Sequence, residues 1–90
     1  MPRYIIERDI PGAGAMSRDD LQGASCKSCS VISSMPPGLT WLQSYVTDDR
    51  IYCVYDASSE DAIREHAEKS GFPANRISEV KNTIDPTWGK

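Results

Sequence analysis

The sequence predicts an α+β protein in which four strands form an antiparallel sheet and two helices cover one of its faces. Two observations lead to this fold class. The hydrophobic periodicity changes several times between the two-residue repeat of strands and the longer repeat of helices. In addition, a serine followed by acidic residues stands at two points where helical periodicity begins. The elements then follow in the order βαββαβ, which is the ferredoxin-like, split βαβ arrangement.

The strands are predicted from short runs of β-favouring residues that are bounded by turn residues. The first run leads into a loop over residues 10–15 that contains two glycines and a proline. Asp48 and Asp49 form a short acidic hairpin turn between the second and third runs. The predicted strands are residues 4–9, 39–47, 50–56 and 76–81.

Both helices are predicted from their capping residues. Ser17 has a hydroxyl that can accept a backbone N–H, and Asp20 can reach back to it, as in a capping box. This helix should extend to about Met35, because two prolines and a glycine follow. The segment 58–61 repeats the signature and opens a second helix through residue 70, with Gly71 as its C-terminal cap.

Length and composition predict one domain over residues 1–90, in which 82–90 form a tail with room for one extra short strand. The apolar run among the first nine residues is short and interrupted by charge, unlike the core of a signal peptide, so we expect a cytoplasmic protein. The net charge of −3 and the scattered basic residues argue against nucleic-acid binding. No stretch approaches the roughly 18 apolar residues that a membrane span requires. Three cysteines in a cytosolic chain also argue against a disulfide framework.

The second and third strands carry apolar residues on both faces, which predicts a partner for the sheet. Alternation in the second strand would direct Leu39, Trp41 and Tyr45 to one face and Leu42 and Val46 to the other. In the third strand Ile51, Cys53 and Tyr55 would oppose Tyr52 and Val54. Because helices bury only one face, we expect a second copy to cover the other as a sheet-to-sheet homodimer.

Cys26 and Cys29 form a C-x-x-C pair on the first predicted helix. Helical spacing places Leu21, Ala24, Ser28, Ile32 and Met35 on the inward face of that helix. Cys29 then lies at the boundary of this face and Cys26 near the solvent side. Because the pair is about two turns from the helix N-terminus, the helix dipole gives its thiols little activation. Three readings stay open: no special role, contact with a metal, or redox sensing. Cys53 is predicted to be core.

His66 is the sole histidine, and it lies beside the inward face of the second helix. It is either a partly buried packing residue or a metal ligand or general acid–base. Glu7 and Glu79 stand on the first and last strands, where a carboxylate faces water or a partner, or else serves as a base or hard-metal ligand. The tyrosines Tyr45, Tyr52 and Tyr55 suggest either core and interface packing or, together with Glu7, the lining of a ligand pocket.

The segment "DDRIYCVYDAS" followed by "EDAIREHAEKSGFPANRISEV" resembles a family of small bacterial proteins. This family is also described as nickel-responsive or nickel-binding-protein-like, and was formerly a domain of unknown function. The shared features are the I-Y-C strand, the acidic turn before it, the E-H pair of the helix, and the G-x-P-x-N-x-I segment that leads to the E-V pair. The resemblance implies a ferredoxin-like dimer. It also implies nickel or another divalent metal as a cofactor, with ligands drawn from His66, Glu65 and Glu79.

Two main functions therefore remain open at this stage. The first is a binding module that holds a divalent metal or a small-molecule ligand. The alternative is a cofactor-independent enzyme, in which His, Glu and Tyr side chains transfer protons on a small aromatic or carbonyl substrate. A redox-sensing interaction protein that uses Cys26 and Cys29 is a third reading.

Overall fold

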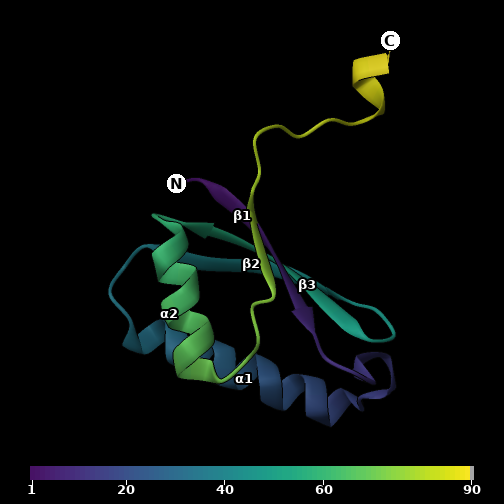
Figure 1. Cartoon of the computed structure of the whole chain (residues 1–90), viewed down its shortest axis with the longest axis vertical. Coiled ribbons are helices and arrows are strands. Elements are labelled where there is room, and N and C mark those ends of the chain that lie inside the picture. Colours follow the sequence, from purple (N-terminus) through teal and green to yellow (C-terminus); the bar gives the residue numbers. More distant parts are fainter. Residues whose placement is uncertain (90) are drawn as a thin grey trace.

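The computed structural model describes residues 1–89, and it has the predicted βαββαβ order (Figure 1). Two short 3-10 helices, η1 and η2, are added to the predicted elements. The bounds are β1 Arg3–Asp9, η1 Ala13–Ala15, α1 Arg18–Ser34, β2 Leu39–Val46, β3 Arg50–Ala57, α2 Glu60–Ser70, β4 Arg76–Glu79 and η2 Pro86–Gly89.

The four strands form one antiparallel sheet in the order β2-β3-β1-β4. The first strand is central, because Ile6 is paired with Cys53 of β3 on one side and with Ile77 of β4 on the other. This strand order, with the two helices as connections, confirms the predicted ferredoxin-like fold.

Both helix caps form as their local sequences predict. The Ser17 side chain accepts from the backbone N–H of Asp20, and the Asp20 side chain accepts from that of Ser17. Ser59 caps α2 in a similar way. At the other end of α2, Gly71 adopts φ 78°, the left-handed conformation that glycine enters without steric cost.

The loop between β1 and α1 lies on the turn between β2 and β3. Ile10 donates to the carbonyl of Asp49, and Gly12 donates to the Asp49 carboxylate. Gly14 donates to the carbonyl of Asp48, and a β-carbon at Gly14 would stand 2.9 Å from the Asp48 α-carbon. The close approach of this loop to Asp48 therefore requires a glycine at position 14. The contact between the loop and the turn holds one end of α1 over the end of the sheet.

One face of the sheet is covered by the helices and holds the core. On β1 the residues facing the helices are Tyr4, Ile6 and Arg8, and all three are buried. They pack with alternate residues of β3 and with apolar residues of the two helices. The buried cluster consists of Tyr4, Ile6, Met35, Leu39, Cys53, Tyr55, Ala57 and Ile63. Cys53 is thus a core residue, as predicted.

The prediction of which β2 side chains point toward the helices is wrong beyond Trp41, because the strand contains a bulge at Leu42. Trp41 pairs with Tyr55, and the next paired residue, Gln43, faces Val54. An extra residue in one strand shifts all later side chains to the opposite face. Tyr45 consequently pairs with Tyr52 on the face away from the helices, while Val46 turns toward them.

The opposite face of the sheet is open to solvent in the single chain. Its exposed apolar residues include Ile5, at 39% exposure, and Tyr45, at 56%. Charged residues surround them: Arg3 pairs with Asp56, and Arg50 pairs with Asp9. A homodimer through this face stays a prediction.

The chain continues beyond β4 as a segment that projects from the body and ends in η2 (Figure 1). The extra strand allowed for 82–90 does not form among residues 82–89, where Pro86–Gly89 is a 3-10 helix instead. Residue 90 lies outside the described residues.

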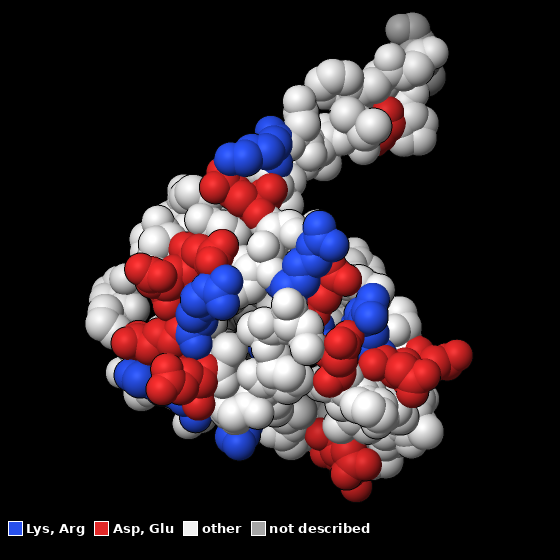
Figure 2. All heavy atoms as spheres, viewed as in Figure 1, with Lys and Arg blue, Asp and Glu red and all other residues white. Residues whose placement is uncertain are grey.

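Within residues 1–89, no helix is long and apolar enough to cross a membrane. Acidic and basic side chains are interspersed over the face shown in Figure 2.

Candidate functional site

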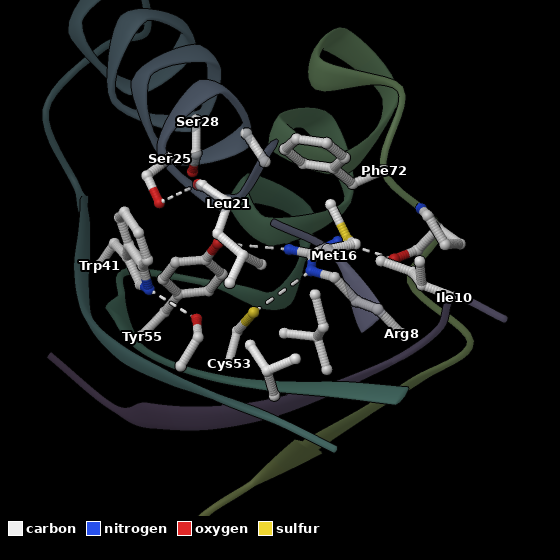
Figure 3. A pocket seen from close by; sticks show the side chains of 15 residues that line it. Arg8, Ile10, Met16, Leu21, Ser25, Ser28, Trp41, Cys53, Tyr55 and Phe72 are labelled. Atoms are coloured by element: carbon white, nitrogen blue, oxygen red, sulfur yellow. Dashed lines mark hydrogen bonds between the residues drawn. The ribbon is translucent and has the colours of Figure 1, made fainter. Parts of the chain in front are cut away.

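A cavity of about 410 Å³ lies between the sheet and α1, with the segment after α2 on its other side (Figure 3). Its volume falls within the range of small-molecule sites. The α1 side chains Leu21, Ala24 and Ser28 line one wall, and Trp41 and Tyr55 of the sheet line another. Met16, Ile51, Phe72 and Pro73 complete much of the apolar lining.

The β2 bulge shapes one wall of this cavity. It brings Ser44 and Trp41 to the same face, where the Trp41 indole Nε1 donates to the Ser44 hydroxyl at 2.9 Å. Both residues line the cavity, together with Val46. Without the bulge, Ser44 and Val46 would face the open side of the sheet.

Arg8 is the charged residue of the lining, and its side chain extends along the cavity between Tyr55 and Phe72 (Figure 3). The residue is 2% exposed. Its guanidinium donates to three neutral acceptors: the Cys53 Sγ at 3.4 Å, the Pro73 carbonyl at 2.7 Å and the Tyr55 hydroxyl at 3.3 Å. Among residues 1–89, no Asp or Glu side chain forms an ion pair with it.

Aromatic rings supply part of the electrostatic compensation for this charge. The Arg8 guanidinium carbon lies 6.0 Å from the ring centres of both Tyr55 and Phe72. On the outside of α1, Lys27 places its Nζ 5.7 Å from the Phe72 ring centre. Two cations therefore lie near the same lining ring.

Behind the cavity wall, His66 joins α2 to α1. The residue is fully buried, and its Nε2 lies 3.1 Å from the Ser28 Oγ. Its Nδ1 is buried without a hydrogen-bond partner among the described residues. The imidazole packs edge-on against Tyr55 at 5.6 Å between ring centres. Burial lowers the pKa of His66, and the Arg8 charge lowers it further, so His66 is held neutral.

Tyr55 connects these groups. Burial raises the pKa of the Tyr55 hydroxyl above its usual value, while the Arg8 charge acts in the opposite direction. The phenol therefore stays protonated at neutral pH. Arg8, Tyr55, His66 and Ser28 form a buried polar group of one cation and three neutral side chains, beside an apolar space.

The residues predicted to line a pocket of three tyrosines and Glu7 lie on opposite faces of the sheet in the single chain. Tyr55 lines the cavity. Tyr45 and Tyr52 form a cross-strand pair on the open face. Glu7 stands opposite Tyr52 on that face, with its carboxylate 3.5 Å from Arg50 and 3.8 Å from Arg76.

The residues predicted as metal ligands are not gathered in the single chain. His66 is buried, whereas Glu65 is exposed on the outer side of α2. Glu79 is on the edge strand β4, and its carboxylate pairs with Lys81 at 2.9 Å. Residues 1–89 contain no group of three or more His, Cys, Asp or Glu side chains placed to hold a metal ion.

The C-x-x-C thiols lie away from the cavity. Cys26 and Cys29 are both exposed on α1, whereas Cys53 is buried on β3 beside Arg8. The redox reading of the exposed pair stays a prediction.

Sequence reasoning missed Arg8, although the chain contained a signal for it. In the alternation of β1, Arg8 shares its face with Tyr4 and Ile6. A charged residue in the inward register of a central strand is costly unless a partner compensates it. That position indicated either a buried ion pair or a ligand contact.

A sequence model for the family described as "Nickel responsive protein SCO4226-like" matches residues 4–80. The chain belongs to this family. The match covers β1 from Tyr4 onward, the other three strands, both helices and all the residues of the cavity. A search among curated proteins found no match.

A solved structure shows the same fold. The crystal structure of SCO4226 from Streptomyces coelicolor A3(2) is similar to this chain with a TM-score of 0.77 and 20% sequence identity. The alignment covers 91% of this chain and 99% of that one. At this identity the likeness concerns the fold.

Within residues 1–89 of a single chain, the side chains do not fit a nickel site. Nickel favours imidazole nitrogens. The sole imidazole is enclosed in the core, with one nitrogen on Ser28, and it stands near the positive charge of Arg8. A cation brought there would add a second uncompensated positive charge to a site without carboxylates.

Proposed function

We propose that this protein is a binding module for a small, largely apolar organic molecule, which occupies the cavity between the sheet and α1. The single observation that carries the proposal is the cavity itself, with about 410 Å³ in a chain of 90 residues. This space is partly open to solvent, and its volume lies within the range of small-molecule sites.

The lining supports an organic ligand. Its walls are made mostly of aliphatic and aromatic side chains, among them Leu21, Trp41 and Phe72, and a few polar groups converge at one side. This combination of an apolar body and a small polar cluster is typical of sites for small molecules. The protein binds the apolar part by burial and orients the polar part by hydrogen bonds.

Metal binding is the second candidate, and the description of the family favours it. It would use His66 with Glu65 and Glu79, and it would require these side chains to be brought together by a rearrangement or by a second copy. A response to nickel does not require a bound nickel ion, so the family's description is also compatible with an organic ligand.

Native mass spectrometry of the untagged protein, purified without chelator, tests both candidates. Under the first, the spectrum gains the mass of an organic ligand when the protein is mixed with small apolar compounds. Under the second, nickel binds in stoichiometric amount and is lost in His66→Ala. Retention of nickel by the wild type, together with no organic binding, would overturn the first proposal.

A pair of variants on one helix locates the organic site. Ala24→Phe places a ring in the cavity and should abolish ligand binding, because Ala24 lines it. Gln22→Phe adds the same ring to the exposed side of α1 and should leave binding intact. Equal binding by the two variants would show that the ligand lies elsewhere.

A further inference from the structure

We infer that Arg8 selects an organic anion, and that the ligand of the cavity is a carboxylate with an apolar body. This inference rests on the proposed function and adds the chemical class of the ligand. It follows from the way in which a buried positive charge is placed in an otherwise apolar space.

The charge balance of the cavity is the first argument. The chain has a net charge of −3 and 13 acidic residues, yet none of them lines the cavity. Among residues 1–89, the one ionised group of the lining is Arg8. A buried charge without a counter-ion lowers the stability of the fold, and the chain contains 13 acidic residues that could have supplied a partner. The missing negative charge is therefore assigned to the ligand.

The hydrogen bonding of Arg8 is the second argument. A guanidinium carries five N–H donors. Three of its bonds go to a thiol, a backbone carbonyl and a phenol, which orient the group but carry no charge. Donor capacity therefore remains for a carboxylate, whose geometry matches the guanidinium fork. The three neutral contacts hold Arg8 in place before the ligand arrives.

The surroundings of Phe72 are the third argument. Its ring lines the cavity and lies close to two cations, Arg8 inside and Lys27 on α1. No acidic residue of residues 1–89 forms an ion pair with either of them. The positive potential of this side of the cavity attracts an anion and repels a metal cation or an amine.

Two pairs of isosteric probes test the inference on the wild-type protein: decanoate with decanamide, and 2-naphthoate with 2-naphthamide. Each pair differs in charge and hardly in shape. We expect the carboxylate of at least one pair to bind roughly ten- to a hundredfold more tightly than its amide, the usual gain for a charged hydrogen bond. Isothermal titration calorimetry measures both affinities.

Three variants assign the preference to Arg8. Arg8→Gln should bind acid and amide with similar affinity, and Arg8→Lys should keep part of the preference for the acid. Arg64→Gln removes an exposed arginine of α2 and should behave as wild type. Circular dichroism checks the fold of each variant. If Arg8→Gln does not fold, the ¹⁵N resonance of the Arg8 Nε in the wild type gives the same information. That resonance should shift with the acid and much less with the amide.

The outcomes separate this inference from the function on which it rests. Tight binding of acids that is lost in Arg8→Gln supports both. Equal binding of acid and amide by the wild type would overturn the role of Arg8 and leave the apolar cavity as a binding site. Binding of neither member of either pair would overturn both.

Discussion

The Nε2 atom of His66 lies 3.1 Å from the Ser28 Oγ, so a buried hydrogen bond joins the two helices behind the wall of the cavity. The sole histidine is therefore a structural link between α2 and α1. Its neutral form is the one that the surroundings favour, because burial and the nearby Arg8 charge both lower its pKa.

The first prediction concerns the pH dependence of stability. The unfolded chain binds a proton at His66 as the pH falls through about 6.5, whereas the folded protein binds it only at lower pH. The free energy of unfolding should thus decrease below about pH 6.5, by at most about 1.4 kcal/mol per pH unit from this group. Above that range His66 should contribute no slope. Urea unfolding between pH 5 and pH 8 measures the effect.

His66→Phe is the matched variant, because it keeps an aromatic ring against Tyr55 and removes the titrating group. Its free energy of unfolding should depend less on pH than that of the wild type over the same range. The same dependence in both proteins would show that carboxylates, and not His66, control stability there.

The second prediction uses the two tryptophans of the chain. Trp41 lines the cavity, while Trp88 is exposed in the C-terminal segment. In Trp88→Phe the emission comes from Trp41 alone, and binding of decanoate or 2-naphthoate should change its intensity or wavelength. In Trp41→Phe the remaining emission should stay constant. A response from Trp88 alone would place the ligand outside the cavity.

The third prediction concerns the open face of the sheet. Val54 lies there between Ile5 and Gln43, and we propose that this face pairs with that of a second copy. This face has an apolar centre that is flanked by ion pairs such as Arg50 with Asp9. Val54→Lys should convert the dimer to a monomer, because it buries a lysine without a partner.

Analytical ultracentrifugation measures the assembly state, and Gln22→Lys is the control, since it adds the same charge on the exposed side of α1. A wild-type protein that sediments as a monomer at high micromolar concentration would contradict the proposed dimer. A dimer that persists in Val54→Lys would place the interface on another surface.

The fourth prediction concerns the three thiols. Cys26 and Cys29 are exposed and should react quickly with a disulfide reagent, whereas Cys53, at 5% exposure, should react slowly. A carboxylate bound next to Arg8 should slow Cys53 further. Three equal rates would contradict the buried position of Cys53.

The redox reading of Cys26 and Cys29 also predicts a disulfide between them after mild peroxide, which peptide mass analysis would detect.

The elements of the fold could be predicted because their signals are local. Ser17 and Asp20 cap α1 through contacts within one turn of helix, and Gly71 ends α2 because its own backbone adopts a positive φ. Hydrophobic alternation placed β1 and β3 correctly, and the acidic turn at residues 48 and 49 joined β2 to β3. The inward position of Ser28 followed from helical spacing as well.

Only the tertiary structure decided which of these residues form the candidate site. The bulge at Leu42, which pairing with β3 reveals, moved Tyr45 away from the cavity and brought Ser44 into it. Arg8 could be assigned to the inward face from sequence. The sequence did not show, however, that the groups around its guanidinium carry no negative charge. Those groups belong to Tyr55, Phe72 and Pro73, which are distant from Arg8 in the sequence. Periodicity reports the face of a residue, whereas the charge and space around it depend on everything that packs over that face.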